Sequence, residues 1–204
     1  MHKPVSLQIK NLCVERGERL LCHDLSFSVQ GGDLVRIVGE NGAGKSSLIK
    51  AILGWITIED GSVEFNGEDV TSHREMLLSK QLYIGHLTGI KDVFTAAENL
   101  SLYCPDATSL EISAALDKVN LAHYEDTPAS QLSAGQKRRV ALARLWLTDK
   151  AIWFLDEPFT ALDVSGVETL EQRIAEHLSI GGAVVMTTHQ PLIHLNPKVV
   201  ELGL

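Results

Sequence analysis

The chain of 204 residues is long enough for one domain with a full hydrophobic core, and its composition, 45% hydrophobic and 22% charged, excludes a disordered chain. Its formal net charge of −8 argues against nucleic acid as the main ligand, because neutralising a phosphate backbone requires clustered Lys and Arg. A nucleotide site remains open, since backbone amides also hold phosphates.

The predicted elements begin with β-strands, continue through helices and end with alternating helices and strands. Strands are predicted at residues 6–14, 25–29, 33–38 and 61–66, with one helix at 45–53 among them. Helices are predicted at 95–103, 110–119, 136–148 and 165–178, and further strands at 151–155 and 183–187. The last two strands are continuously apolar, which is typical of a parallel sheet covered on both faces. We therefore predict an α/β fold with a mainly parallel sheet core, an antiparallel β edge and a helical insertion.

A glycine-rich loop between the strand 33–38 and the following helix predicts a phosphate site. Residues 39–46 read GENGAGKS and match the pattern GxxxxGK[ST]. Glycines let consecutive backbone N–H groups face one phosphate, and the helix adds its positive N-terminal end. Lys45 is expected to reach the β- and γ-phosphates, and Ser46 to bind Mg²⁺. The predicted nucleotide-binding residues of this segment are Gly39, Glu40, Asn41, Gly42, Ala43, Gly44, Lys45, Ser46 and Ser47.

Polar residues follow two of the predicted strands and supply the expected chemistry. Asp156 ends the apolar strand 151–155 and is expected to hold Mg²⁺ with Ser46. Glu157 comes one residue later, where it would orient the attacking water or accept its proton. His189 follows the strand 183–187 and is expected to contact the γ-phosphate, so that Lys45, Glu157 and His189 form the predicted catalytic set. Without the phosphate loop, two solvated acids in a turn would be the simpler interpretation.

The chain carries no predicted signal for export or for crossing a membrane. Residues 1–4 lead into alternating sequence rather than an apolar stretch, and no apolar run reaches the ~18 residues that span a bilayer. Cys13, Cys22 and Cys104 lack the spacing of a zinc site and are expected to be buried free thiols in a reducing compartment. A cytosolic or peripheral protein is expected.

Residues 132–136, LSAGQ, distinguish this chain from other nucleotide-hydrolysing proteins. Together with the phosphate loop and the Asp-Glu pair they resemble the ABC ATPase family over essentially the whole chain, and LSAGQ is similar to its LSGGQ signature. The resemblance implies that the signature completes the site of a second copy, so that ATP joins an ATP-dependent homodimer. The residues concerned are Leu132, Ser133, Ala134, Gly135 and Gln136, with Asp163 in the similar D-loop. An ordinary helix cap is the alternative interpretation of LSAGQ.

The resemblance also implies the domain organisation. It predicts a single ABC ATPase domain over residues 1–204, with a nucleotide-binding core at about 1–86 and 133–204 and a helical insertion at about 87–132. The insertion is expected to carry the docking surface for a membrane subunit.

Two positions depart from the family pattern. The family stacks an aromatic residue on adenine, and the corresponding position here is Arg16 or, alternatively, Val14. A guanidinium also stacks on a base, so weaker base selectivity is expected. His86 stands nearest to the family's glutamine before the insertion. Because magnesium prefers oxygen ligands, His86 is left outside the predicted metal set.

Several segments resemble one subfamily, the ATP-binding subunits of bacterial cytochrome c biogenesis (haem exporter) complexes. They are residues 84–86, 89–91, 143–147, 153–163 and 187–192. The resemblance implies ATP hydrolysis that energises haem export or release of a haem-loaded chaperone, an integral membrane partner of the CcmB type, and a place on the cytoplasmic face of the bacterial inner membrane. No residue reads as a haem ligand, so no direct haem binding by this chain is expected.

Three alternatives belong to other classes. One is the ATPase subunit of an ABC transporter with a different substrate, such as a lipid or peptide. A soluble ABC protein of translation or DNA repair usually carries two ATPase halves or a long coiled coil, whereas the segment between the phosphate loop and LSAGQ is short and compact here. A small-molecule kinase with a phosphate loop has no need of LSAGQ.

Overall fold

The computed structural model describes residues 5–17 and 19–203, which form two compact units. The first unit contains Met1–Tyr83, Lys150–Glu157 and Ala175–Leu204, and the second contains Ile84–Asp149 and Pro158–Ile174. The predicted insertion at 87–132 lies inside the second unit, while the proposed boundaries of core and insertion stay a prediction. Residues 1–4, on which the expectation of no signal peptide rests, lie outside the described residues.

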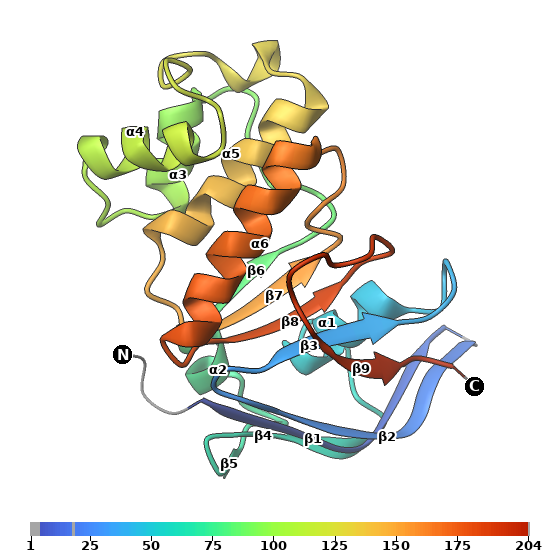
Figure 1. The fold of residues 1–204 in the computed structure, drawn as a ribbon. Coiled ribbons are helices and arrows are strands. Elements are labelled where there is room, and N and C mark those ends of the chain that lie inside the picture. The colour runs from blue at the N-terminus through green and yellow to red at the C-terminus, as the bar shows by residue number, and fades with distance from the viewer. Residues whose placement is uncertain (1–4, 18, 204) are drawn as a thin grey trace. The chain divides into compact units, whose positions relative to one another are not determined.

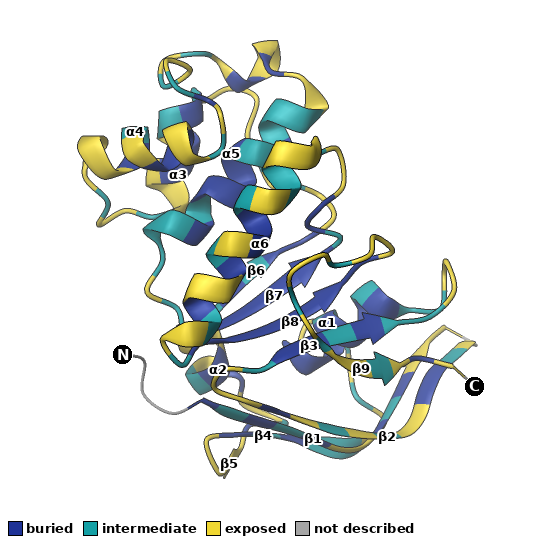
Figure 2. Ribbon diagram, in the orientation of Figure 1, coloured by how far each residue is buried: buried dark blue, intermediate teal, exposed yellow. Residues whose placement is uncertain are grey.

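A five-stranded sheet of order β6-β7-β8-β3-β9 provides the framework of the first unit (Figure 1). Its strands are β3 (Leu34–Val38), β6 (Gln81–Ile84), β7 (Ile152–Asp156), β8 (Ala183–Thr187) and β9 (Lys198–Glu201). β7 pairs with β8, β8 with β3 and β3 with β9, all in parallel. Every residue of β7 and β8 is buried, as the dark blue ribbon in Figure 2 shows, which confirms that these apolar strands are covered on both faces.

The antiparallel strands form a sheet of their own, of order β2-β1-β4-β5, rather than an edge of the parallel sheet. Its strands are β1 (Ser6–Arg16), β2 (Arg19–Gln30), β4 (Asp60–Phe65) and β5 (Glu68–Asp69). The α/β class is confirmed with this refinement. The local connection between β1 and β2 permits only antiparallel pairing, since a parallel pair needs a long crossover.

Helix α1 (Lys45–Ile52) joins the two sheets through the core of the first unit. Leu48 and Ile49 are fully buried in a cluster that includes Leu7 of β1 and Val35 of β3. The helix ends against the buried side chain of Arg74, which precedes α2 (Glu75–Lys80) and donates to the Ile52 carbonyl at 2.9 Å. This bond satisfies a carbonyl that the end of a helix leaves without an intrahelical donor.

The second unit is helical. It contains α3 (Ala96–Tyr103), α4 (Ser109–Lys118), the 3₁₀ turn η1 (Ala129–Gln131) and α5 (Ala134–Leu147), and α6 (Val164–Ser179) begins there and ends in the first unit. Leu100, Leu116 and Val140 pack in its core. Capping boxes at Thr95 and Thr108 fix where α3 and α4 begin, because each threonine hydroxyl accepts from the backbone N–H three residues later.

The predicted elements agree with the structure except at irregular places. β1 and β2 are longer than expected, and β5, α2, β6, η1 and β9 were not predicted. Among the described residues, no helix combines the length and the apolar character needed to cross a bilayer.

Ile49→Ala tests the central place of α1. The side chain is fully buried, so its truncation should lower the free energy of unfolding by about 2–5 kcal/mol. Val199→Ala is the control, because Val199 is 61% exposed and should change stability by no more than about 0.5 kcal/mol. Urea unfolding followed by circular dichroism measures both, and equal effects would contradict the assignment of the core.

Candidate functional site

The glycine loop curls tightly after β3. Gly39, Gly42 and Gly44 have φ of 154°, 79° and 104°, in the region where side chains other than glycine are strained. A Cβ at Gly39 would lie 2.6 Å from the Leu202 carbonyl oxygen, whereas one at Gly42 would meet nothing within 4 Å. The loop therefore rests on backbone at one end and faces open space near its tip.

The Lys45 side chain is hydrogen-bonded to the backbone of the glycine loop. The residue is 9% exposed, and its ammonium donates to the carbonyls of Gly39 at 2.8 Å and Glu40 at 3.0 Å. Gly44 is the N-cap of α1 and makes no side-chain capping bond. The positive end of α1 and the lysine charge therefore meet at the loop, an arrangement suited to an anion.

Two acids and a hydroxyl meet where β7 and β8 end. Asp156 pairs with Thr187 across the ladder and accepts a hydrogen bond from its hydroxyl at 2.7 Å. The Glu157 N–H donates both to the Thr187 hydroxyl at 3.0 Å and to the Thr187 carbonyl at 3.1 Å. β8 lies between β7 and β3 in the sheet. The strand that ends in the predicted acids is therefore not the direct neighbour of the strand that leads into the phosphate loop.

Glu157 has a strained backbone. Its φ of 51° lies in the left-handed region, which costs of order 1–3 kcal/mol for residues other than glycine and is frequent at functional sites. The carboxylate Oε1 lies 3.6 Å from Nε2 of His189, whose side chain is 53% exposed. The structure thus brings together Asp156, Glu157 and His189, as the sequence predicts.

Two residues of this region escaped the sequence analysis. Arg36 on β3 donates from Nη2 at 2.9 Å and from Nε at 3.2 Å to the Thr188 carbonyl, and so holds the turn that leads to His189. Thr187 is the second. The only signal for Arg36 was a charged residue inside the apolar strand Leu34–Val38.

The signature residues lie at the N-terminus of α5 in the second unit. Ser133 is the N-cap: its hydroxyl accepts from the Gln136 N–H at 3.2 Å, and the Gln136 side chain accepts from the Ser133 N–H at 2.8 Å. Leu132 is buried, whereas Ser133 and Ala134 are exposed. These hydrogen bonds confirm that Ser133 caps the helix. A role of the signature toward the nucleotide of a second copy stays a prediction.

Asp163 links the loop before α6 to α5. It accepts from the Gly166 N–H at 3.0 Å and pairs with Arg139 at 3.0 Å. The hydrogen bond from the Gly166 N–H is the largest cause of the lowered pKa of Asp163; burial opposes it, and Arg139 lowers the pKa further. A Cβ at Gly135 would lie 3.3 Å from the Ala161 carbonyl oxygen, so a larger residue there would press on this loop.

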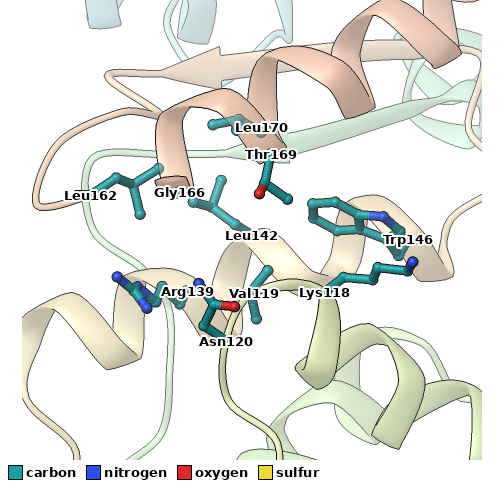
Figure 3. Close-up of a pocket in the computed structure, with 10 residues that line it drawn as sticks. All are labelled: Lys118, Val119, Asn120, Arg139, Leu142, Trp146, Leu162, Gly166, Thr169 and Leu170. Carbon is teal, nitrogen blue, oxygen red and sulfur yellow. The ribbon is translucent and has the colours of Figure 1, made fainter. Parts of the chain in front are cut away.

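A small pocket lies near this link (Figure 3). Arg139, Leu142 and Trp146 of α5 line it together with Leu162 and other residues of the second unit. Its volume of about 20 Å³ accommodates no more than a water-sized group. The pocket is therefore not a nucleotide site.

Arg16 and His86, the two positions that depart from the family pattern, are both exposed. Arg16 is exposed at the end of β1, whereas Val14 is fully buried, so the alternative that Val14 stacks on a base is wrong. His86 is exposed in the second unit.

The expectation of buried free thiols holds fully only for Cys22, because Cys13 and Cys104 are partly exposed. Cys13, Cys22 and Cys104 are free, and burial is the largest cause of the raised pKa of Cys22 and of Cys104. A raised pKa keeps a thiol protonated and unreactive. Across residues 5–17 and 19–203, no group of three or more His, Cys, Asp or Glu side chains could hold a metal ion.

Comparison with known proteins agrees with this geometry. A family model described as ABC transporter matches residues 22–160. The chain is 46% identical over 198 residues to the cytochrome c biogenesis ATP-binding export protein CcmA of Escherichia coli (strain K12), covering 97% of this chain and 96% of that protein. The same figures hold for the protein of that name from Shigella flexneri.

Solved structures share the fold. A structure described as the ATP binding subunit of an ABC transporter superimposes with a TM-score of 0.80 at 25% identity, over 90% of this chain and 79% of the other. A dimeric ATP-binding cassette in a post-hydrolysis state, bound to ADP and phosphate, gives a TM-score of 0.83 at 23% identity, over 96% and 94%.

Lys45→Ala tests the phosphate loop. The change removes the charge that would meet the β- and γ-phosphates together with the two bonds to the loop carbonyls. Phosphate release should fall by at least about a hundredfold, and ATP affinity should fall as well. Lys50→Ala, on the same helix outside the loop, should keep normal turnover. Undiminished hydrolysis by the Lys45 variant would refute the site.

Proposed function

This chain belongs to the ABC transporter family, and from that membership we propose that it is the ATP-hydrolysing subunit of a membrane complex for c-type cytochrome biogenesis. The observation that carries the proposal is its 46% identity over 97% of its length to CcmA proteins. The work done by hydrolysis is haem export or release of a haem-loaded chaperone.

The first unit binds ATP and prepares the water for attack. Backbone amides of residues 39–46 and the N-terminus of α1 hold the phosphates. Lys45 exchanges its two carbonyl partners for oxygens of the β- and γ-phosphates. Glu157 accepts a hydrogen bond or the proton from the water that attacks the γ-phosphorus, and His189, 3.6 Å from its carboxylate, contacts the γ-phosphate. Arg16 stacks on the base.

The residues present suit a magnesium ion. The Asp156 carboxylate is buried and the Ser46 hydroxyl lies in the first turn of α1, and both are the oxygen donors that Mg²⁺ prefers. Two protein ligands are enough, because Mg²⁺ in such sites is otherwise bound by water and phosphate oxygens. When bound, the ion neutralises charge on the β- and γ-phosphates. We assign Ser46 and Asp156 to its coordination.

A second copy completes the site. The exposed tip of α5 offers the Ser133 hydroxyl and the amides around Gly135 to a γ-phosphate, together with the positive end of the helix. Asp163, fixed to Arg139 and Gly166, holds the loop that passes between the two copies. The assembly is therefore an ATP-dependent homodimer in which LSAGQ of one copy closes over the nucleotide of the other.

The helical insertion docks the membrane subunit. Leu87, Val93 and Leu110 of this segment are 86%, 86% and 81% exposed, and a partner that covered them would remove their apolar surface from water. We assign the partner to the CcmB type and place the complex on the cytoplasmic face of the bacterial inner membrane. The chain itself binds neither haem nor nucleic acid.

A matched pair of variants tests the composite site. Glu157→Gln should slow hydrolysis far more than binding and accumulate an ATP-bound dimer. In that background Ser133→Asp and Ser133→Asn both keep a good N-cap, but only Asp puts a negative charge against a phosphate. Light scattering with ATP should show dimer for Asn and monomer for Asp, with equal ATP affinity in the monomers. Dimers in both cases would contradict the shared site.

Gene deletion tests the cellular role. We expect c-type cytochromes to be lost while b-type haem persists, and wild type but not Lys45→Ala to restore them, as measured by haem staining of gels. Mass spectrometry of the complex from solubilised membranes identifies the partner. Normal c-type cytochromes after deletion would favour a transporter with another substrate.

A further inference from the structure

We propose that Thr187 is a positioning residue for ATP hydrolysis, because its hydroxyl is hydrogen-bonded to the carboxylate of Asp156, the last residue of β7, and to the backbone N–H of Glu157, the next residue. The inference rests on the roles proposed above for Asp156 and Glu157. Thr187 is fully buried at the last position of β8, so it acts through these acids and does not touch the nucleotide.

The Thr187 hydroxyl donates a hydrogen bond to one acidic residue through its carboxylate and accepts one from the other through its backbone N–H. It donates to Asp156 Oδ1 at 2.7 Å and accepts from the Glu157 N–H at 3.0 Å. A threonine hydroxyl carries one proton, so acceptance from Glu157 leaves that proton aimed at Asp156. Asp156 is 2% exposed, and this hydrogen bond fixes the orientation of its carboxylate.

The same hydroxyl supports the strained backbone of Glu157. The Glu157 N–H is shared between the Thr187 hydroxyl and carbonyl, which holds the peptide plane before the Cα of this residue, whose φ is 51°. This conformation sends the carboxylate toward His189 at 3.6 Å. Loss of the hydroxyl removes one of the two acceptors and loosens the peptide plane from which the Glu157 side chain is positioned.

The strand does not need the hydroxyl to stay in place. Thr187 is held in the ladder by its backbone, with register to Asp156 on one side and to Ile37 on the other. Arg36 holds the next carbonyl, that of Thr188, at 2.9 Å. Removing the hydroxyl should therefore free the acids while β8 keeps its position.

Thr187→Val and Thr187→Ser separate the hydroxyl from the shape of the side chain. Valine has the same size without the hydroxyl, and serine keeps the hydroxyl. We expect Thr187→Val to lower kcat by about tenfold or more and to raise severalfold the Mg²⁺ concentration that gives half-maximal ATPase activity. ATP affinity without Mg²⁺, measured by equilibrium binding, should be unchanged. Thr187→Ser should have nearly the wild-type kcat and the wild-type half-maximal Mg²⁺ concentration.

The outcomes are distinguishable. A folded Thr187→Val protein with wild-type kcat and Mg²⁺ dependence would overturn the proposal. If that variant does not fold, Thr187→Cys, a weak donor of similar size, should give an intermediate loss at unchanged melting temperature, and wild-type kinetics there would also overturn it. Glu157→Gln and Asp156→Asn test the underlying site. If both variants hydrolyse ATP normally, the proposed roles of the two acids are wrong. If both are impaired while Thr187→Val is normal, only the proposed role of Thr187 is wrong.

Discussion

Parallel pairing of β7 with β8 and of β8 with β3 is the constraint on which the site in the first unit depends. Strands that run in parallel end at the same edge, so the glycine loop, the two acids and the polar end of β8 are brought together by strand order alone. β7 and β8 are buried along their whole length, and burial of apolar surface drives their pairing. The two acids and the polar end of β8 are thus held by strands that are buried along their whole length.

An acidic protein holds phosphate by local arrangement rather than by overall charge. The net charge is −8, so in the proposed site the attraction for phosphate would come from the loop amides, the end of α1 and Lys45. Lys45 is already buried against two carbonyl oxygens, so much of the cost of removing its ammonium from water is met by folding. Exchanging carbonyl oxygens for phosphate oxygens therefore requires little further desolvation.

The parts of the site that sequence predicts are those made by contiguous residues. A glycine loop, an Asp-Glu pair after an apolar strand and a helix beginning at Ser133 are all visible as local patterns. Thr187 and Arg36 were missed because their roles arise from partners 31 and 152 residues away and from the position of β8 between β3 and β7. The separate antiparallel sheet was missed for the same reason: local patterns indicate strands but not which sheet they join.

The two interpretations of LSAGQ, a helix cap and a phosphate-binding tip, are compatible on physical grounds. The Ser133 hydroxyl uses an acceptor lone pair for the Gln136 N–H, which leaves its proton for another acceptor. Burial of Leu132 and the close approach of the Ala161 carbonyl to Gly135 hold the tip from both sides. The cap therefore orients the donors before any nucleotide arrives, and that pre-organisation lowers the entropic cost of closing over a phosphate. A tip arranged in this way suits a site that is assembled and released in each cycle, since no refolding accompanies either step.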